Sequence, residues 1–264
     1  MSHRLTVLGC GSSGGVPRIG VNWGQCDPHE PKNRRRRCAI LVERIETGAR
    51  TTVLVDTPPD LREQLLDVRL SVLDAVLYTH DHADHTHGID DLRMVAYAMK
   101  RRIPCHMDPI TKAALEMRFT YCFKSPAGSS YPPILTATEI TPRVPIEIKG
   151  AAGSITALPI PQHHGDIDSL GFRFGNVAYS PDISGFIDGS EHMLEGLDVW
   201  IVDALRYTPH PSHFHLKRAL EWIGKLKPKR AILTHMTTDL DYETLRRELP
   251  PNVEPAHDGM VIEF

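Results

Sequence analysis

The chain has 264 residues, 41% of them hydrophobic and 24% charged, a composition typical of a globular protein long enough for one large α/β domain. Its net charge of −3 argues against nucleic-acid binding by bulk charge. The chain has no apolar run near the length of a membrane span, and its first residues lack the apolar core of a signal peptide. The five cysteines are odd in number and show no C-x-x-C spacing. We therefore expect reduced thiols, a cytoplasmic location, no membrane partner and a single domain over residues 1–264.

The N-terminal region is predicted to form a strand and a glycine-rich loop. The strand covers residues 5–8 and the loop covers residues 9–15. Glycines let backbone N–H groups approach an anion, and Ser12 and Ser13 add hydroxyl donors, so this loop is a candidate substrate contact. The basic run at residues 32–37 has three open interpretations. It is a solvated surface loop, a phosphate-attracting patch, or a strut that packs under the glycine loop.

The run from Thr79 to His85 is the most informative stretch of the chain, and it reads Thr-His-Asp-His-Ala-Asp-His. An apolar, β-favouring strand is predicted before it at residues 75–78, and a helix after it at residues 88–99. A rigid strand that ends in a turn rich in imidazoles and carboxylates is a natural place for a metal site.

The spacing within this turn predicts which of its side chains can bind the same metal ion. His80 and His82 are two residues apart, so in extended backbone they point to the same side and can bind one ion. Asp84 and His85 lie further along the turn and can face a second ion. Imidazole and carboxylate ligands suit zinc, iron or manganese, and a site with open positions is catalytic rather than structural.

Three later strands are each followed by residues of the same ligand type. Strand ends that converge on one edge of a sandwich would build a single site. The strands predicted at residues 153–160, 176–180 and 230–234 precede His163 and His164, then Asp182, and then His235.

The remaining elements complete an α/β pattern. Residues 119–150, rich in Pro, Gly, Ser and Thr near residues 125–133, are interpreted as a long crossing segment. Strands in both halves with helices outside predict an αββα sandwich with the metals on one edge. Further strands are predicted at residues 169–174, 198–203 and 259–264, and helices at residues 213–226 and 242–249.

The H-x-H-x-D-H run and the later strand-end ligands resemble the metallo-β-lactamase superfamily over nearly the whole chain. Within it, the chain is most similar to the group that contains the phosphoribosyl cyclic phosphodiesterases. Some members carry three cysteines for a structural zinc after the glycine loop, but this chain has only Cys26 there, so we expect no such zinc. The motifs that carry the resemblance are the glycine loop, His-Gly-Ile-Asp-Asp-Leu-Arg at 87–93, Leu-Arg-Tyr at 205–207 with His213 after it, and Ile-Leu-Thr-His at 232–235.

The resemblance implies two divalent metal ions, zinc or manganese, and a ligand for each position. His163 competes with His164, and we expect His164 because the family's ligand usually stands directly before a glycine. Asp56, at the end of an earlier strand, would orient the metal turn through hydrogen bonds. The first ion would be bound by His80, His82 and His164, the second by Asp84, His85 and His235, and Asp182 would bridge them together with a water.

The implied activity is that of a metal-dependent phosphoric diester hydrolase. Two ions about 3.5–4 Å apart lower the pKa of a bridging water, and the resulting hydroxide attacks phosphorus. The catalytic residues would be Asp84 and His213, with His213 as proton donor to the leaving oxygen; the alternative is that His213 only caps a helix. Arg206 would join Ser12 and Ser13 as a substrate contact. We expect a small cyclic or nucleotide-like phosphodiester as substrate, and a homodimer.

Proteins of the same fold have other functions, and three of them are alternatives for this chain. A ribonuclease Z-like tRNA-processing endonuclease shares the metal ligands, but it usually carries a protruding basic arm, and this chain has no lengthy insertion rich in Gly and Lys. A thioester or lactone hydrolase is the third candidate. A metal-binding protein without activity is disfavoured because all seven inferred ligands are present.

Overall fold

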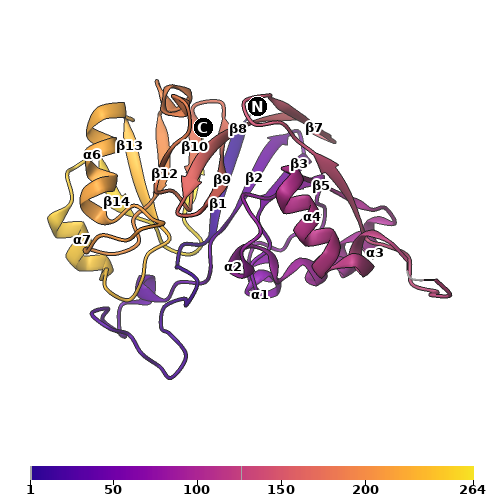
Figure 1. The fold of residues 1–264 in the computed structure, drawn as a ribbon, viewed down its shortest axis with the longest axis horizontal. Coiled ribbons are helices and arrows are strands. Elements are labelled where there is room, and N and C mark those ends of the chain that lie inside the picture. Colours follow the sequence, from indigo (N-terminus) through magenta and orange to yellow (C-terminus); the bar gives the residue numbers. More distant parts are fainter. Residues whose placement is uncertain (1, 126) are drawn as a thin grey trace.

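The computed structural model describes residues 2–125 and 127–264. Two β-sheets pack face to face and helices cover their outer faces, so the layers follow the order helix, sheet, sheet, helix (Figure 1). The αββα sandwich expected from the sequence is therefore confirmed. Within the described part of the chain, no helix is long and apolar enough to cross a membrane.

The first sheet combines N-terminal strands with the last strand of the chain. Its order is β15 (Val261–Glu263), β1 (Ser2–Gly9), β2 (Ala39–Glu46), β3 (Ala49–Val55), β4 (Ala75–Leu77), β5 (Ile103–Met107) and β6 (Leu135–Glu139). β1, β2 and β3 form an antiparallel meander, whereas β3, β4, β5 and β6 are parallel.

The second sheet comes from the C-terminal half. Its order is β11 (Gly185–Phe186), β8 (Gly153–His164), β9 (Ile167–Phe174), β10 (Val177–Ser180), β12 (Val199–Asp203), β13 (Arg230–Thr234) and β14 (Val253–Pro255), and β7 (Ile146–Gly150) pairs with β8. Because β10, β12 and β13 are parallel, their carboxyl ends reach the same edge of the sheet.

The helices divide between the two outer faces. On the first sheet lie α1 (Leu61–Asp67), α3 (Leu92–Met99), α4 (Pro109–Arg118) and α5 (Thr120–Phe123); on the second lie α6 (Leu216–Leu226) and α7 (Tyr242–Glu248) (Figure 1). The short α2 (Ala83–Thr86) belongs to the turn after β4, and 3₁₀ turns occur at Pro31–Asn33, Ile89–Asp91 and Ser190–Leu194.

The alternation of strand side chains builds two apolar layers. In β2, Ile40 and Val42 face the core between the sheets, whereas Ala39 and Leu41 face the helices outside the first sheet. The core between the sheets continues through the second sheet to α6 and α7. Each fully buried Ile, Leu or Val contributes about 1.5–3 kcal/mol, so both layers hold the strand ends in place.

Two sequence predictions need correction. The helix predicted at residues 88–99 is divided into the 3₁₀ turn Ile89–Asp91 and α3. The crossing segment predicted at residues 119–150 instead contains α5, β6 and β7. β6 reads Leu-Thr-Ala-Thr-Glu and buries only its first residue, because an edge strand has little apolar periodicity to detect.

The basic run at residues 32–37 packs against the glycine loop. Arg35 is fully buried, donates to the carbonyl of Thr237 and the side chain of Asn33, and its backbone pairs with Val16. Arg36 forms ion pairs with Asp67 and Asp258, and Arg37 with Asp60. Of the three interpretations given above, the structure favours the packing strut.

Candidate metal centre

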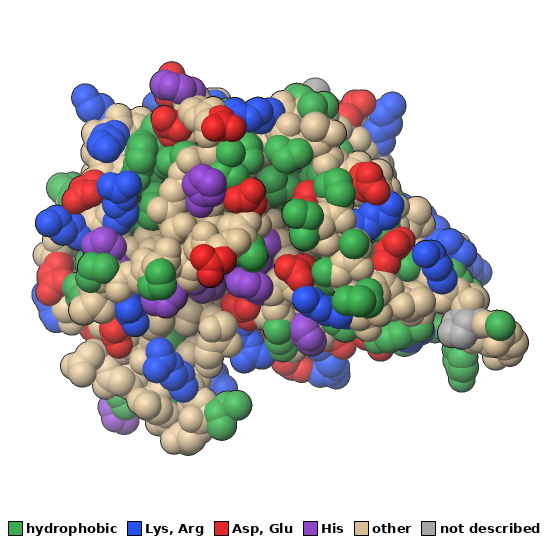
Figure 2. All heavy atoms as spheres, viewed as in Figure 1, with side chains coloured by type: hydrophobic (Ala, Val, Ile, Leu, Met, Phe, Trp, Pro, Cys, Tyr) green, Lys and Arg blue, Asp and Glu red, His purple; other side chains and the backbone are tan. Residues whose placement is uncertain are grey.

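Five strand ends from the two sheets meet at one edge of the sandwich. β4 leads into the turn with the H-x-H-x-D-H motif, and β8, β10, β12 and β13 end beside it. A hydrogen bond from Leu170 N to Thr79 O (2.9 Å) joins the turn to the second sheet. Figure 2 shows several histidine side chains near the middle of this face of the molecule, with acidic side chains among them.

Asp56 holds the metal turn from inside the protein. Its carboxylate accepts hydrogen bonds from Thr79 N and Thr79 Oγ1 (both 2.9 Å) and from His85 Nδ1 (2.7 Å). The last bond leaves the lone pair on Nε2 of His85 for a ligand. Asp56 has a φ of 67° and His235 a φ of 57°, so two residues of this region occupy the left-handed conformation that L-residues seldom adopt.

His80, His82 and His164 form a first cluster. His164 Nε2 lies 3.2 Å from His82 Nδ1, and the ring centroids of His80 and His164 are 5.0 Å apart. His80 Nδ1 contacts Thr79 Oγ1 (3.0 Å), and His164 Nδ1 donates to the carbonyl of Ser212 (2.7 Å), so their Nε2 atoms are left for a ligand. One ligand-type atom from each of the three residues lies within 4.8 Å of the others.

Asp84, His85 and His235 form a second cluster, and Asp182 lies between the two. The Nε2 atoms of His85 and His235 are each 3.6 Å from Asp84 Oδ2. Asp182 lies 3.0 Å from His85, 3.4 Å from His235 and 3.6 Å from His164, measured from its nearer oxygen to each Nε2. The seven side chains that the sequence analysis singled out as ligands are thus brought together in space.

The chemistry of these side chains fits divalent metal ions. Nε2 of His80, His85 and His235 and Oδ2 of Asp182 are buried without a hydrogen-bond partner among the described residues, which is costly unless another group binds them. Burial lowers the pKa of His80 and lowers that of His164 to about 4. These imidazoles are therefore neutral at physiological pH, which is the form that binds a metal.

His213 adjoins the clusters and is paired with a residue that the sequence analysis missed, Asp203. His213 Nδ1 donates to Asp203 Oδ2 (2.8 Å), and the His213 ring stacks on His235 with centroids 4.7 Å apart. Asp203 is fully buried, also accepts a hydrogen bond from Ile183 N (3.2 Å), and has its pKa raised by burial. The signal was available, because the strand predicted at residues 198–203 ends in this carboxylate just as another strand precedes Asp182.

The other predicted contacts lie around this centre. His163 is 52% exposed and pairs with Asp168, whereas His164 is buried in the first cluster. Ser12 is buried and its N–H donates to the carbonyl of Met236, directly after His235, while Ser13 is exposed. The guanidinium of Arg206 donates to the carbonyls of Thr208 and Pro209, so it stabilises the loop at residues 206–209.

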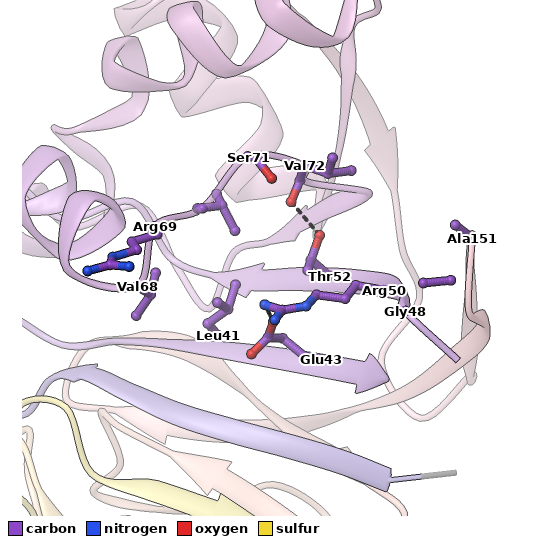
Figure 3. A pocket seen from close by; sticks show the side chains of 12 residues that line it. Leu41, Glu43, Gly48, Arg50, Thr52, Val68, Arg69, Ser71, Val72 and Ala151 are labelled. Atoms are coloured by element: carbon purple, nitrogen blue, oxygen red, sulfur yellow. Dashed lines mark hydrogen bonds and ion pairs between the residues drawn. The ribbon is translucent and has the colours of Figure 1, made fainter. Parts of the chain in front are cut away.

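A separate cavity of about 370 Å³ lies over β2 and β3, beyond the end of α1 (Figure 3). Its lining includes Leu41, Glu43, Arg50 and Arg69, and Arg50 forms an ion pair with Glu43. None of the clustered histidines reaches it, so this cavity is not part of the candidate metal centre.

An αββα sandwich with clustered imidazoles and carboxylates at one edge defines a metal-dependent hydrolase. The chain belongs to the β-lactamase superfamily, since the family model described as the beta-lactamase superfamily domain matches residues 51–236.

Solved structures and curated proteins show which members of the superfamily this chain resembles. The crystal structure of a new diphosphatase from the PhnP family superposes with a TM-score of 0.89 at 37% identity, over 100% of this chain and 98% of the other, and supports the phosphodiesterase-like group expected from the motifs. Human tRNase Z, short form, shares the fold (TM-score 0.63, 18% identity, 98% of each chain). A Porphyromonas gingivalis protein named octanoyltransferase is 30% identical over 261 residues, covering 97% of this chain and 51% of that protein. The chain therefore spans about half the length of this relative.

Proposed function

We propose that the chain is a dinuclear-metal hydrolase that cleaves small phosphoric diesters of cyclic or nucleotide-like type. The observation that carries the proposal is the meeting of seven ligand-type side chains beside the His213–Asp203 pair. The likeness to a PhnP-family diphosphatase supports attack at phosphorus. The continuous core between the sheets supports treating residues 1–264 as one domain.

The two clusters assign the ligands of the two proposed ions. His80, His82 and His164 would hold the first ion, Asp84, His85 and His235 the second, and Asp182 would contact both. Zinc and manganese both suit this donor set. Two such ions supply a water of lowered pKa and neutralise charge that develops on the phosphoryl oxygens.

His213 is proposed to protonate the leaving oxygen. Its Nδ1 is committed to Asp203, so only Nε2 remains for the substrate, and the hydrogen bond to Asp203 fixes the orientation of the ring. Asp84 is proposed to act beside the second ion, where it faces both His85 and His235.

The glycine loop is proposed to contact the substrate phosphate. Backbone bonds join Cys10 to Met236 and Ser12 to Met236, so the loop lies along the segment that follows His235. Ser12 and Ser13 can then offer hydroxyl donors, while Arg206 keeps the 206–209 loop, and hence the segment before His213, in position.

Two other substrate classes compete with small phosphodiesters as the proposed substrate. A tRNA-processing endonuclease shares this fold, but residues 127–132, which are exposed and extend from the body of the protein, contain no Lys or Arg. Acyl compounds are the other class, and the curated relative's name refers to an acyl group.

A substrate panel tests the proposal. Protein loaded with zinc or manganese would be assayed on a ribose cyclic phosphate, a dinucleoside monophosphate, a precursor tRNA, an acyl thioester and a lactone. We expect kcat/KM for one of the first two to exceed the others by about 100-fold or more, consistent with about 2.7 kcal/mol of transition-state discrimination. Preferred turnover of the tRNA, the thioester or the lactone would contradict it.

A further inference from the structure

The metal turn is also held from outside the first sheet, by Arg118 at the end of α4. Arg118 Nη1 donates to the carbonyl oxygen of Asp81 (2.5 Å), and Nη2 pairs with the Asp81 carboxylate (2.6 Å). Asp81 stands between His80 and His82. One guanidinium therefore holds both the backbone and the side chain of the residue in the middle of the H-x-H pair.

His82 depends on this clamp more than its neighbours do. His80, His85 and His164 each have Nδ1 hydrogen-bonded to a group outside the two clusters. The exposed ring of His82 has no such bond in the part of the chain that the structure describes; its one recorded hydrogen-bond contact is with His164. Its position is therefore set by the backbone, and the carbonyl that Arg118 binds belongs to the peptide unit joining Asp81 to His82.

A second contact joins the same part of α4 to the turn. Phe119, the residue after Arg118, packs edge-on against His87 with ring centroids 5.4 Å apart. His87 follows directly after α2, so the end of α4 contacts the motif on both sides of Asp84 and His85. Figure 1 shows α4 beside the α2 turn.

We propose that Arg118 is a positioning residue for His82 and so sets the affinity of the first metal site. This inference rests on the proposed function, because it assigns His82 to the first ion. Partners that orient metal ligands from outside the site typically change metal affinity by about 10-fold to 100-fold when removed. The guanidinium touches neither cluster, so its effect has to pass through Asp81 and the backbone.

The test is a calorimetric titration of metal-free protein with Zn²⁺ in a competing chelator, for wild type and Arg118→Ala. We expect one of the two dissociation constants to rise about 10-fold and the other to change less than about twofold. Co²⁺ in place of Zn²⁺ should show a changed visible spectrum for the weakened site alone.

Arg101→Ala is the matched control. Arg101 is also a half-exposed arginine outside the first sheet, and it binds a carboxylate and a backbone carbonyl, those of Asp74 and Leu73. It lies away from the metal turn, so its loss should lower Tm without changing either dissociation constant. Arg118→Lys retains the charge but not the two-pronged bond, and should weaken the same site by a smaller factor. Asp81→Asn, which removes the ion pair but keeps the carbonyl, should do likewise.

The outcomes separate the two proposals. Wild-type protein that binds fewer than two ions would overturn the proposed function itself. Two ions in wild type with unchanged affinities in Arg118→Ala, or equal losses in Arg118→Ala and Arg101→Ala, would overturn only the role of Arg118. If Arg118→Ala does not fold, Arg118→Lys and Asp81→Asn decide: a selective loss at one site supports the role, and wild-type affinities overturn it.

Discussion

Buried carboxylates are the most informative residues of this site. Asp56, Asp182 and Asp203 are each at most 2% exposed, and each faces at least one histidine. Buried negative charge is tolerated only with cations or hydrogen-bond donors around it. Asp56 is satisfied by the protein alone, whereas Asp182 retains an oxygen without a hydrogen-bond partner among the described groups.

Replacing Asp182 should therefore disrupt the centre rather than the fold. We expect Asp182→Ala to lower metal content from two ions to one or fewer and to lower phosphodiester turnover at least about 10²-fold, because the proposed shared ligand is lost. Metal analysis after dialysis and initial rates on the same samples give the readout. Asp168→Ala is the control, since Asp168 is an exposed partner of His163, and its metal content should equal that of wild type.

His213 should affect turnover without affecting metal binding. We expect His213→Ala to lower kcat about 10²- to 10⁴-fold while both ions stay bound, as is typical for loss of a general acid. Asp203→Ala should lower kcat as well, because the ring of His213 loses the hydrogen-bond acceptor that fixes its orientation. Full activity of His213→Ala on every substrate that the wild type cleaves would rule out the proton-donor role.

At the scale of single elements, α7 ties the N-terminal loop to the second sheet. Asp241 caps this helix by accepting from Thr244 N (2.8 Å), and it also accepts from Asp27 N and from Asn33 Nδ2. Partial burial pushes the pKa of Asp241 up, but hydrogen bonds from the backbones of Asp27 and Thr244 outweigh it and lower the pKa to about 2.

Asp241 should consequently contribute to stability at neutral pH and lose that contribution in acid. A depressed carboxyl pKa stabilises the fold above the unfolded value of about 3.9, and the effect disappears as the pH falls through about 2. We expect Asp241→Ala to lower the free energy of unfolding by about 1 kcal/mol at pH 7. Urea unfolding at pH 7 and pH 3 measures both effects; a loss in Asp241→Ala that grows towards pH 3 would refute this account.

The elements also show what the sequence could predict. Apolar strands that end in histidine or aspartate were recognisable, because buried strands have a strong pattern and their ends are where ligands gather. β6 and β7 were not, since edge strands alternate weakly and lie in a segment rich in Pro and Thr. Asp203 was missed although its strand also ends in a carboxylate, because its contact with His213 is seen only in the folded chain. Arg118 gave no such signal, since it acts through Asp81.

At the scale of the whole molecule, the metal centre joins the two sheets. One cluster combines the turn after β4 with the end of β8, and the other combines the same turn with the residue after β13. Ions bound there would connect both halves of the sandwich, so metal binding and folding should be linked.

Removal of the metals should lower the melting temperature. An ion present at 100 times its dissociation constant stabilises the fold by about 2.7 kcal/mol, which corresponds to roughly 5–10 °C for a chain of this size. Calorimetry with and without a chelator would show the shift, and Asp182→Ala should show a much smaller one. An equal Tm for the two wild-type samples would contradict metal binding between the sheets.

The most direct measurement is the hydrolysis of bis(p-nitrophenyl) phosphate during titration of metal-free protein with zinc or manganese, with bound ions per chain counted on the same samples. We expect little activity without metal and full activity at two ions per chain. Hydrolysis that is independent of metal, or two bound ions with turnover of a thioester or lactone but of no phosphodiester, would contradict the proposed function.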